Sequence, residues 1–171
     1  MSTYHSALAA TAVGRWHLAS GDSTMEFTGR HFLFLPVQGS FPVREGHVEV
    51  AEDGALTCLE AVVSAAGFET GNPQRDATVR GPRFLDADRF PALRFTAGPC
   101  AAGADVTGLL EVKGRQVPLT LAVDEPAAEG DRVVVRATAR VDRHACGVGA
   151  LRGLVGAELG VRIRAVLVRR P

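Results

Sequence analysis

The segment GNPQRDATVRGPRFLDADRFPALRF, residues 71–95, holds the charged side chains best suited to recognising a ligand. Arg75 and Asp76 are adjacent, Arg80 follows them, and Arg143 lies further along the chain. A guanidinium presents a planar fork of N–H donors to a phosphate or carboxylate, so these arginines could meet an anionic or amide head group at the mouth of a channel. The competing interpretation is that Arg75 and Asp76 pair with each other or with the backbone and fix local structure.

His144 and Cys146 are the pair best placed for metal chemistry, because residues two apart on a strand share one face. A structural zinc site normally needs four ligands, and the other histidines show no matching spacing. The sequence also has no GxSxG elbow and no strand-GxGxxG-helix order. We therefore expect no catalytic residues, no metal and no cofactor. A metal- or haem-assisted enzyme that uses His144 and Cys146 is the least favoured alternative.

The elements that would position these residues are short strands, because apolar residues recur at every second position. The same alternation fits residues 24–31, 106–114, 116–123 and 159–168, and Gly- and Asp-rich turns separate these runs. About eight such strands predict an all-β antiparallel barrel or sandwich with one wet face per strand. In RVVVRATARV, for example, the inward face would carry Val133, Val135, Ala137, Ala139 and Val141.

The opening segment interrupts this pattern and predicts a short helical cap between roughly Asn72 and Asp88. Asn72 is a good N-cap, and Pro73 suits the first helical position because its missing N–H costs nothing there. Gly81 and Pro82 would end the helix after Arg80. Phe84 and Phe90 would then pack the cap onto one end of the barrel.

The composition sets limits on domain count and partners. The 171 residues are enough for one domain, which we place at 14–171 after a flexible N-terminal segment, 1–13. Nineteen basic and nineteen acidic residues balance, so no net charge favours nucleic acid. The chain has no apolar run near the roughly 20 residues of a membrane-spanning helix and no convincing signal peptide. Three widely spaced cysteines without a CxxC pair are typical of a reducing compartment, so we expect a cytoplasmic protein.

Several short motifs follow one another along the chain in the order Trp16, Ser23, Phe27, His31, VQGSF at 37–41, Thr70, Arg75-Asp76, Arg80, FLD at 84–86, FPALRF at 90–95, Gly108, KGRQVPLTL at 113–121, Arg143 and Gly147. In this order they resemble the YceI-like family. Its members are lipocalin-like antiparallel barrels that hold isoprenoid or other amphiphilic lipids in an internal channel. The likeness covers about residues 14–168, and RHACG at 143–147 departs from the usual pattern.

The distribution of side-chain sizes suggests that the barrel is hollow. All eight phenylalanines lie at or before Phe95, and the inward positions after it are small or aliphatic. A barrel of about eight strands can enclose one ligand when its inward residues are small. We therefore predict non-catalytic binding of a polyisoprenoid or similar long-chain lipid. The expected channel lining is Phe27, Phe32, Phe34, Phe41, Phe95, Leu110, Val135, Ala137, Ala139 and Ile163.

The residues leave open whether the interior is filled and how the barrels assemble. The same inward side chains are also compatible with an ordinary packed core, and the barrel would then be a protein-interaction module. The sequence also leaves open whether two barrels pair as a homodimer, and it does not identify the ligand.

Overall fold

The computed structural model describes residues 13–31, 35–150 and 157–169. Most of the predicted N-terminal segment therefore lies outside the described residues. The described chain forms ten strands and one helix, α2 (Pro73–Arg80). The strands are β1 (Gly14–Leu18), β2 (Thr24–His31), β3 (Leu35–Val50), β4 (Leu56–Ser64), β5 (Ala92–Ala97), β6 (Val106–Val112), β7 (Arg115–Val123), β8 (Ala127–Glu129), β9 (Arg132–Asp142) and β10 (Glu158–Val168).

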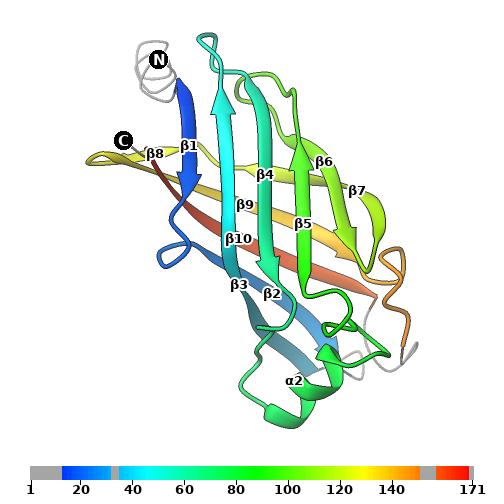
Figure 1. The fold of residues 1–171 in the computed structure, drawn as a ribbon. Helices are drawn as coiled ribbons and strands as arrows, with labels where there is room; N and C mark the ends of the chain where they lie inside the picture. Colours follow the sequence, from blue (N-terminus) through cyan, green and yellow to red (C-terminus); the bar gives the residue numbers. More distant parts are fainter. Residues whose placement is uncertain (1–12, 32–34, 151–156, 170–171) are drawn as a thin grey trace.

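Eight of these strands close into a ring, which is visible as the twisted barrel of Figure 1. Each strand pairs with its neighbours in antiparallel fashion in the order β2, β3, β4, β5, β6, β7, β9, β10 and back to β2. The short β1 bridges β10 and β3, and β8 pairs with β9. The structure confirms the predicted antiparallel barrel of about eight strands and decides against a sandwich.

An irregularity in β3 determines which of its residues face inward. The pairing of β3 with β4 shifts register between Val43 and Glu45, as at a β-bulge. A shift of one residue exchanges the two faces of a strand. As a result Val43 and Val48, which strict alternation would place on opposite faces, both line the interior.

The predicted cap is present. The Asn72 side chain accepts a hydrogen bond from the Arg75 backbone N–H at 3.1 Å, Pro73 begins α2, and the helix ends before Gly81. A turn follows, in which Phe84 and Leu85 are buried in the main core, and Phe90 is half-buried. In Figure 1, α2 and this turn lie across one end of the barrel.

Because neighbouring strands are antiparallel, successive connections lie at opposite ends of the barrel. The two ends are therefore made of different connections. We call one the α2 end, made by the connections 65–91, 113–114 and 143–150, and the other the loop end, made by 51–55, 98–105 and 124–126. In Figure 1 the β3–β4 and β5–β6 connections lie at the top and α2 at the bottom.

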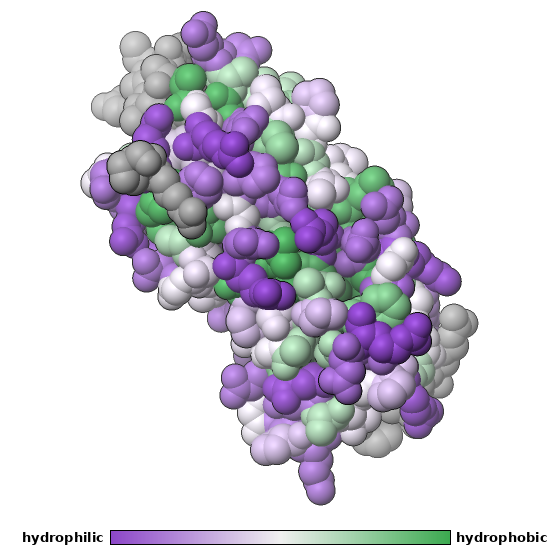
Figure 2. Space-filling model, viewed as in Figure 1, coloured by the Kyte–Doolittle hydropathy of each residue, from purple (hydrophilic) through white to green (hydrophobic). Residues whose placement is uncertain are grey.

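The outer face shown in Figure 2 is mainly hydrophilic, with scattered hydrophobic residues. Outward positions carry exposed ion pairs such as Arg15 with Glu49 and Arg140 with Glu158, which stabilise little on their own. Among the described residues, no helix has the length and apolar character needed to cross a bilayer.

Candidate functional site: a cavity inside the barrel

The interior of the barrel is hollow. A cavity of about 1360 Å³ extends from the α2 end to the loop end, and all eight strands of the ring contribute lining residues. Most of its lining is aliphatic or aromatic, so the space is suited to an apolar molecule. The structure therefore has the interior space that the small inward residues predicted.

The predicted lining residues fall into three groups. Phe32 and Phe34 lie outside the described residues. Ala139 does not line the cavity and is instead half-buried against the neighbouring core side chains. The residues that do line it are Phe27, Phe41, Phe95, Leu110, Val135, Ala137 and Ile163.

Aromatic side chains gather in the half of the cavity near the α2 end. The rings of Phe27 and Phe68 stack with centroids 5.0 Å apart, and Phe41 lies 5.5 Å from Phe27 and 5.3 Å from Phe68. Phe84 belongs to the same buried cluster. Pairs at these separations add to the stabilisation that burial of the rings already supplies. This cluster makes the α2 half of the cavity the more tightly packed half.

A glycine opposite this cluster leaves room for one of the rings. A Cβ at Gly39 would lie 2.4 Å from Cζ of Phe27 and 2.6 Å from the carbonyl oxygen of Glu69. Any side chain at residue 39 would therefore displace Phe27 or the segment that carries Phe68. The ring of Phe27 occupies the volume that a side chain there would need.

Phe68 and Trp16 line the cavity but were not among the predicted lining residues. The sequence singles out Trp16 only through the resemblance to the family, although a tryptophan is usually largely buried and could have been expected to point inward from β1. Phe68 follows β4 in the segment SAAGFET, outside any alternating run, so periodicity gives no indication that it points inward.

The predicted head-group arginines make hydrogen bonds within the protein. Nε of Arg75 donates to the hydroxyl of Thr70 at 2.8 Å, and Arg80 donates to the carbonyl oxygen of Phe68. The buried Arg143 donates from one terminal nitrogen to the carbonyl oxygens of Val148 and Ala150, each at 2.8 Å. Arg75 and Arg143 line the cavity and Arg80 does not.

Asp76 completes this network as a buried carboxylate in α2. It accepts hydrogen bonds from the backbone N–H of Thr70 at 3.0 Å and from its hydroxyl at 2.5 Å. Burial acts to raise the pKa of Asp76, but these bonds and the charges of Arg80 and Arg75 outweigh it and hold the pKa below the ordinary value of 3.8. Thr70, rather than a direct pair between Arg75 and Asp76, joins the two side chains.

His144 and Cys146 lie in the connection between β9 and β10. Cys146 is buried and lines the cavity, and burial, with the nearby Asp142, raises the pKa of its thiol. Nε2 of His144 is buried without a hydrogen-bond partner among the described residues. Among all the residues that the structure describes, no three His, Cys, Asp or Glu side chains come together as a metal site.

The chain matches a known protein family. The model of the YceI-like domain matches residues 16–167. The UPF0312 protein YE1254 of Yersinia enterocolitica is 29% identical over 101 residues, which are 57% of this chain and 53% of that protein. The match therefore spans about half the length of that curated relative.

Solved structures share the fold at low sequence identity. The crystal structure of Burkholderia cenocepacia BcnA has a TM-score of 0.78 at 21% identity, over 87% of this chain and 98% of the other. A polyisoprenoid binding domain from Saccharophagus degradans has a TM-score of 0.71 at 16% identity, over 91% and 98%. The YCEI protein of Campylobacter jejuni has a TM-score of 0.62 at 14% identity, over 77% and 82%.

Proposed function

Since the chain belongs to the YceI-like family, we propose that it binds a long lipophilic molecule, such as a polyisoprenoid, inside the barrel without catalysing a reaction. One observation carries this proposal: the barrel encloses an apolar cavity of about 1360 Å³ along its length. The likeness to a domain described as polyisoprenoid binding is consistent with a chain-like ligand.

The size of the cavity favours a long chain over a compact ligand. The cavity measures about 1360 Å³. This exceeds the volume of roughly 300–1,000 Å³ usual for pockets that hold drug-sized molecules. Burying roughly 15 methylenes would contribute about 12 kcal/mol before the costs of association and ordering are subtracted. Apolar contact alone is therefore a sufficient source of affinity.

The apolar lining would hold the chain, Arg75 and Arg80 would stabilise the cap, and Arg143 would stabilise the connection between β9 and β10. Phe27, Phe41 and Phe95 would contact one part of the ligand, and the smaller side chains would leave space along the opposite wall. Arg75, Arg80 and Arg143 are bonded to Thr70 and to backbone carbonyls, so their geometry supports the structural interpretation of these residues more than contact with a head group.

The test is organic extraction of protein purified under native conditions, followed by mass spectrometry. A long-chain lipid present in stoichiometric amount, and absent from a barrel of similar size purified from the same cells, is the expected result. If the extract contains no such lipid and the purified protein binds no added polyprenol, the proposal is wrong. The alternative of a solid-core interaction module required a filled interior, and the cavity argues against it.

A further inference from the structure

The two ends of the cavity are closed to different extents. At the α2 end the connections bury many of their residues, among them Phe68, Phe84, Arg143, Cys146 and Val148. At the loop end no residue of 51–55, 98–105 or 124–126 is buried. The core packing therefore continues across the α2 end and stops short of the loop end.

The β5–β6 connection at the loop end is made of small residues. Residues 100–104 have the sequence CAAGA, and all five line the cavity. None of them has a side chain larger than that of cysteine. Residues 101–104 are exposed. This segment is held beside the β3–β4 turn by the pairing of Cys100 with Leu56, and the turn contributes Gly54 to the lining. Only small side chains thus separate the cavity from solvent here.

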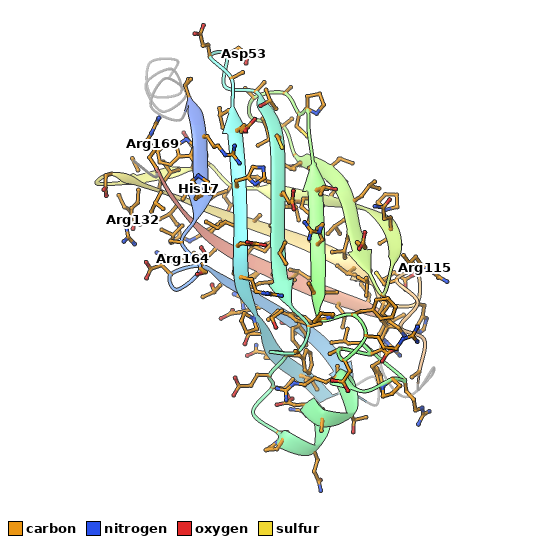
Figure 3. All side chains as sticks on the ribbon, viewed as in Figure 1. His17, Asp53, Arg115, Arg132, Arg164 and Arg169 are labelled. Atoms are coloured by element: carbon orange, nitrogen blue, oxygen red, sulfur yellow. The ribbon has the colours of Figure 1, made fainter. Side chains whose placement is uncertain are left out.

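The loop end is also acidic. Its three connections contain no Lys, Arg or His, whereas the α2-end connections mix acidic residues with arginines and a lysine. One cation lies near this end outside the connections: Arg169, which follows β10, holds its guanidinium 4.3 Å from the centroid of the cavity-lining Trp16 ring. In Figure 3, Asp53 projects from the β3–β4 turn, and Arg115 projects from the opposite half of the barrel beside the β6–β7 turn. Asp124 and Glu125 belong to the cavity lining itself. The carboxylates of the loop-end connections are Glu52, Asp53, Asp105, Asp124 and Glu125.

We propose that the loop end is the portal through which the ligand enters tail first and leaves, and that its carboxylates favour an uncharged head group over a phosphate or carboxylate. This inference rests on the proposed function. A chain that enters here runs toward the aromatic cluster, and its head group stays among Asp124, Glu125 and the neighbouring acidic residues. An anionic head would be repelled there, since like charges at short range are unfavourable even near water. A neutral head, such as an alcohol or a quinone, is not repelled.

Portal position is tested by release kinetics. Wild type and two variants are loaded with a fluorescent polyprenol analogue, and transfer to excess phosphatidylcholine vesicles is timed. Ala102→Trp narrows the loop end, and Gln74→Trp is the matched control, because Gln74 is an exposed cavity-lining residue of α2. We expect Ala102→Trp to release the ligand about tenfold more slowly than wild type, or slower still, because the indole would obstruct the exit at the loop end. Gln74→Trp should release the ligand at the wild-type rate. The reverse pattern would place the portal at the α2 end.

Head-group preference is tested with geranylgeraniol and geranylgeranyl diphosphate, which share one chain. The variant Asp53→Asn/Asp105→Asn/Asp124→Asn removes three charges from the portal. The control Glu26→Gln/Glu45→Gln/Asp88→Asn removes three exposed charges elsewhere. We expect wild type to prefer the alcohol, and the portal variant to gain roughly threefold to tenfold in diphosphate affinity at low salt, with no change for the alcohol. Equal gains in both variants, or none in either, would overturn the charge selection.

The outcomes separate this inference from the proposed function. If wild type binds neither probe and releases no lipid on extraction, the proposed function itself fails. If wild type binds the alcohol but Ala102→Trp releases it at the wild-type rate, the barrel binds lipid and the portal lies elsewhere. Circular dichroism and thermal unfolding of each variant establish that all of them are folded.

Discussion

Asp76 is the charged residue on which the cap depends most. It accepts two hydrogen bonds from Thr70, and Arg75, which also binds Thr70, lies beside it. Asp76→Asn removes the charge and half of the acceptor capacity of a buried group, so we expect a loss of about 1 to 3 kcal/mol in the free energy of unfolding at neutral pH. Urea denaturation measures this loss. Asp88→Asn, a change to an exposed carboxylate three residues from Leu85, is the control and should stay within about 0.5 kcal/mol of wild type.

The same residue predicts a pH dependence. Because the pKa of Asp76 is lower in the folded protein than 3.8, its ordinary value, its contribution to stability is fully present above that value and is lost as the pH falls through the folded pKa. Wild type should therefore lose more stability than Asp76→Asn between neutral pH and pH values below 3.8. The measurement is the free energy of unfolding of both proteins across this range. Parallel curves for the two proteins would contradict the prediction.

At the scale of the elements, much of the barrel could be predicted because its physical signals are local. Alternation predicts β2, β6, β7 and the inward faces of β9 and β10, and the Asn72-Pro73 start and Gly81 stop predict α2. The bulge in β3 has no such signal, since a register shift depends on the partner strand. The inward position of Phe68 depends in the same way on contacts between distant segments.

For the wall of the cavity that β9 forms, the sequence predicts which side chains face inward but not which of them reach the cavity. Ala137 and Val135 line the cavity as expected, while Ala139 faces the same side and is covered by other core residues. Facing inward is a property of one strand, but reaching the cavity depends on how far the opposite side chains extend. Sequence alternation fixes the first property only.

Filling the β9 wall should obstruct the cavity. Ala137 is buried, lines the cavity and lies opposite Ile163 in the sheet register. Ala137→Phe should reduce the amount of co-purifying lipid several-fold while the fold survives, at a cost of about 1 to 3 kcal/mol for overpacking. Thr138→Phe places the same ring on the outer face and is the matched control. Equal lipid content in the two variants, quantified by extraction, would remove this wall from the ligand site.

For the molecule as a whole, a cavity that runs along the barrel should make the binding affinity depend on the length of the ligand. Each added methylene that becomes buried contributes about 0.8 kcal/mol, which is roughly a fourfold gain in affinity. We expect the affinity for a series of polyprenols to rise with chain length and then level off once the volume of about 1360 Å³ is filled. Competition against a fluorescent analogue measures this series. An affinity independent of length would contradict binding along the cavity.

The closed ring has a consequence for what happens when the ligand leaves. Each strand of the ring β2–β7, β9 and β10 pairs with two neighbours, although β7 meets β9 through two residue pairs alone, Ala122 with Thr138 and Val123 with Ala137. Backbone pairing, and not the contents of the interior, holds the sheet together. Residues 115–121 of β7 pair only with β6 and leave one edge unpaired, whereas β1 and β8 are too short to recruit a strand from another molecule. An emptied shell can therefore persist as an intact container and be refilled, without unfolding between one cargo and the next.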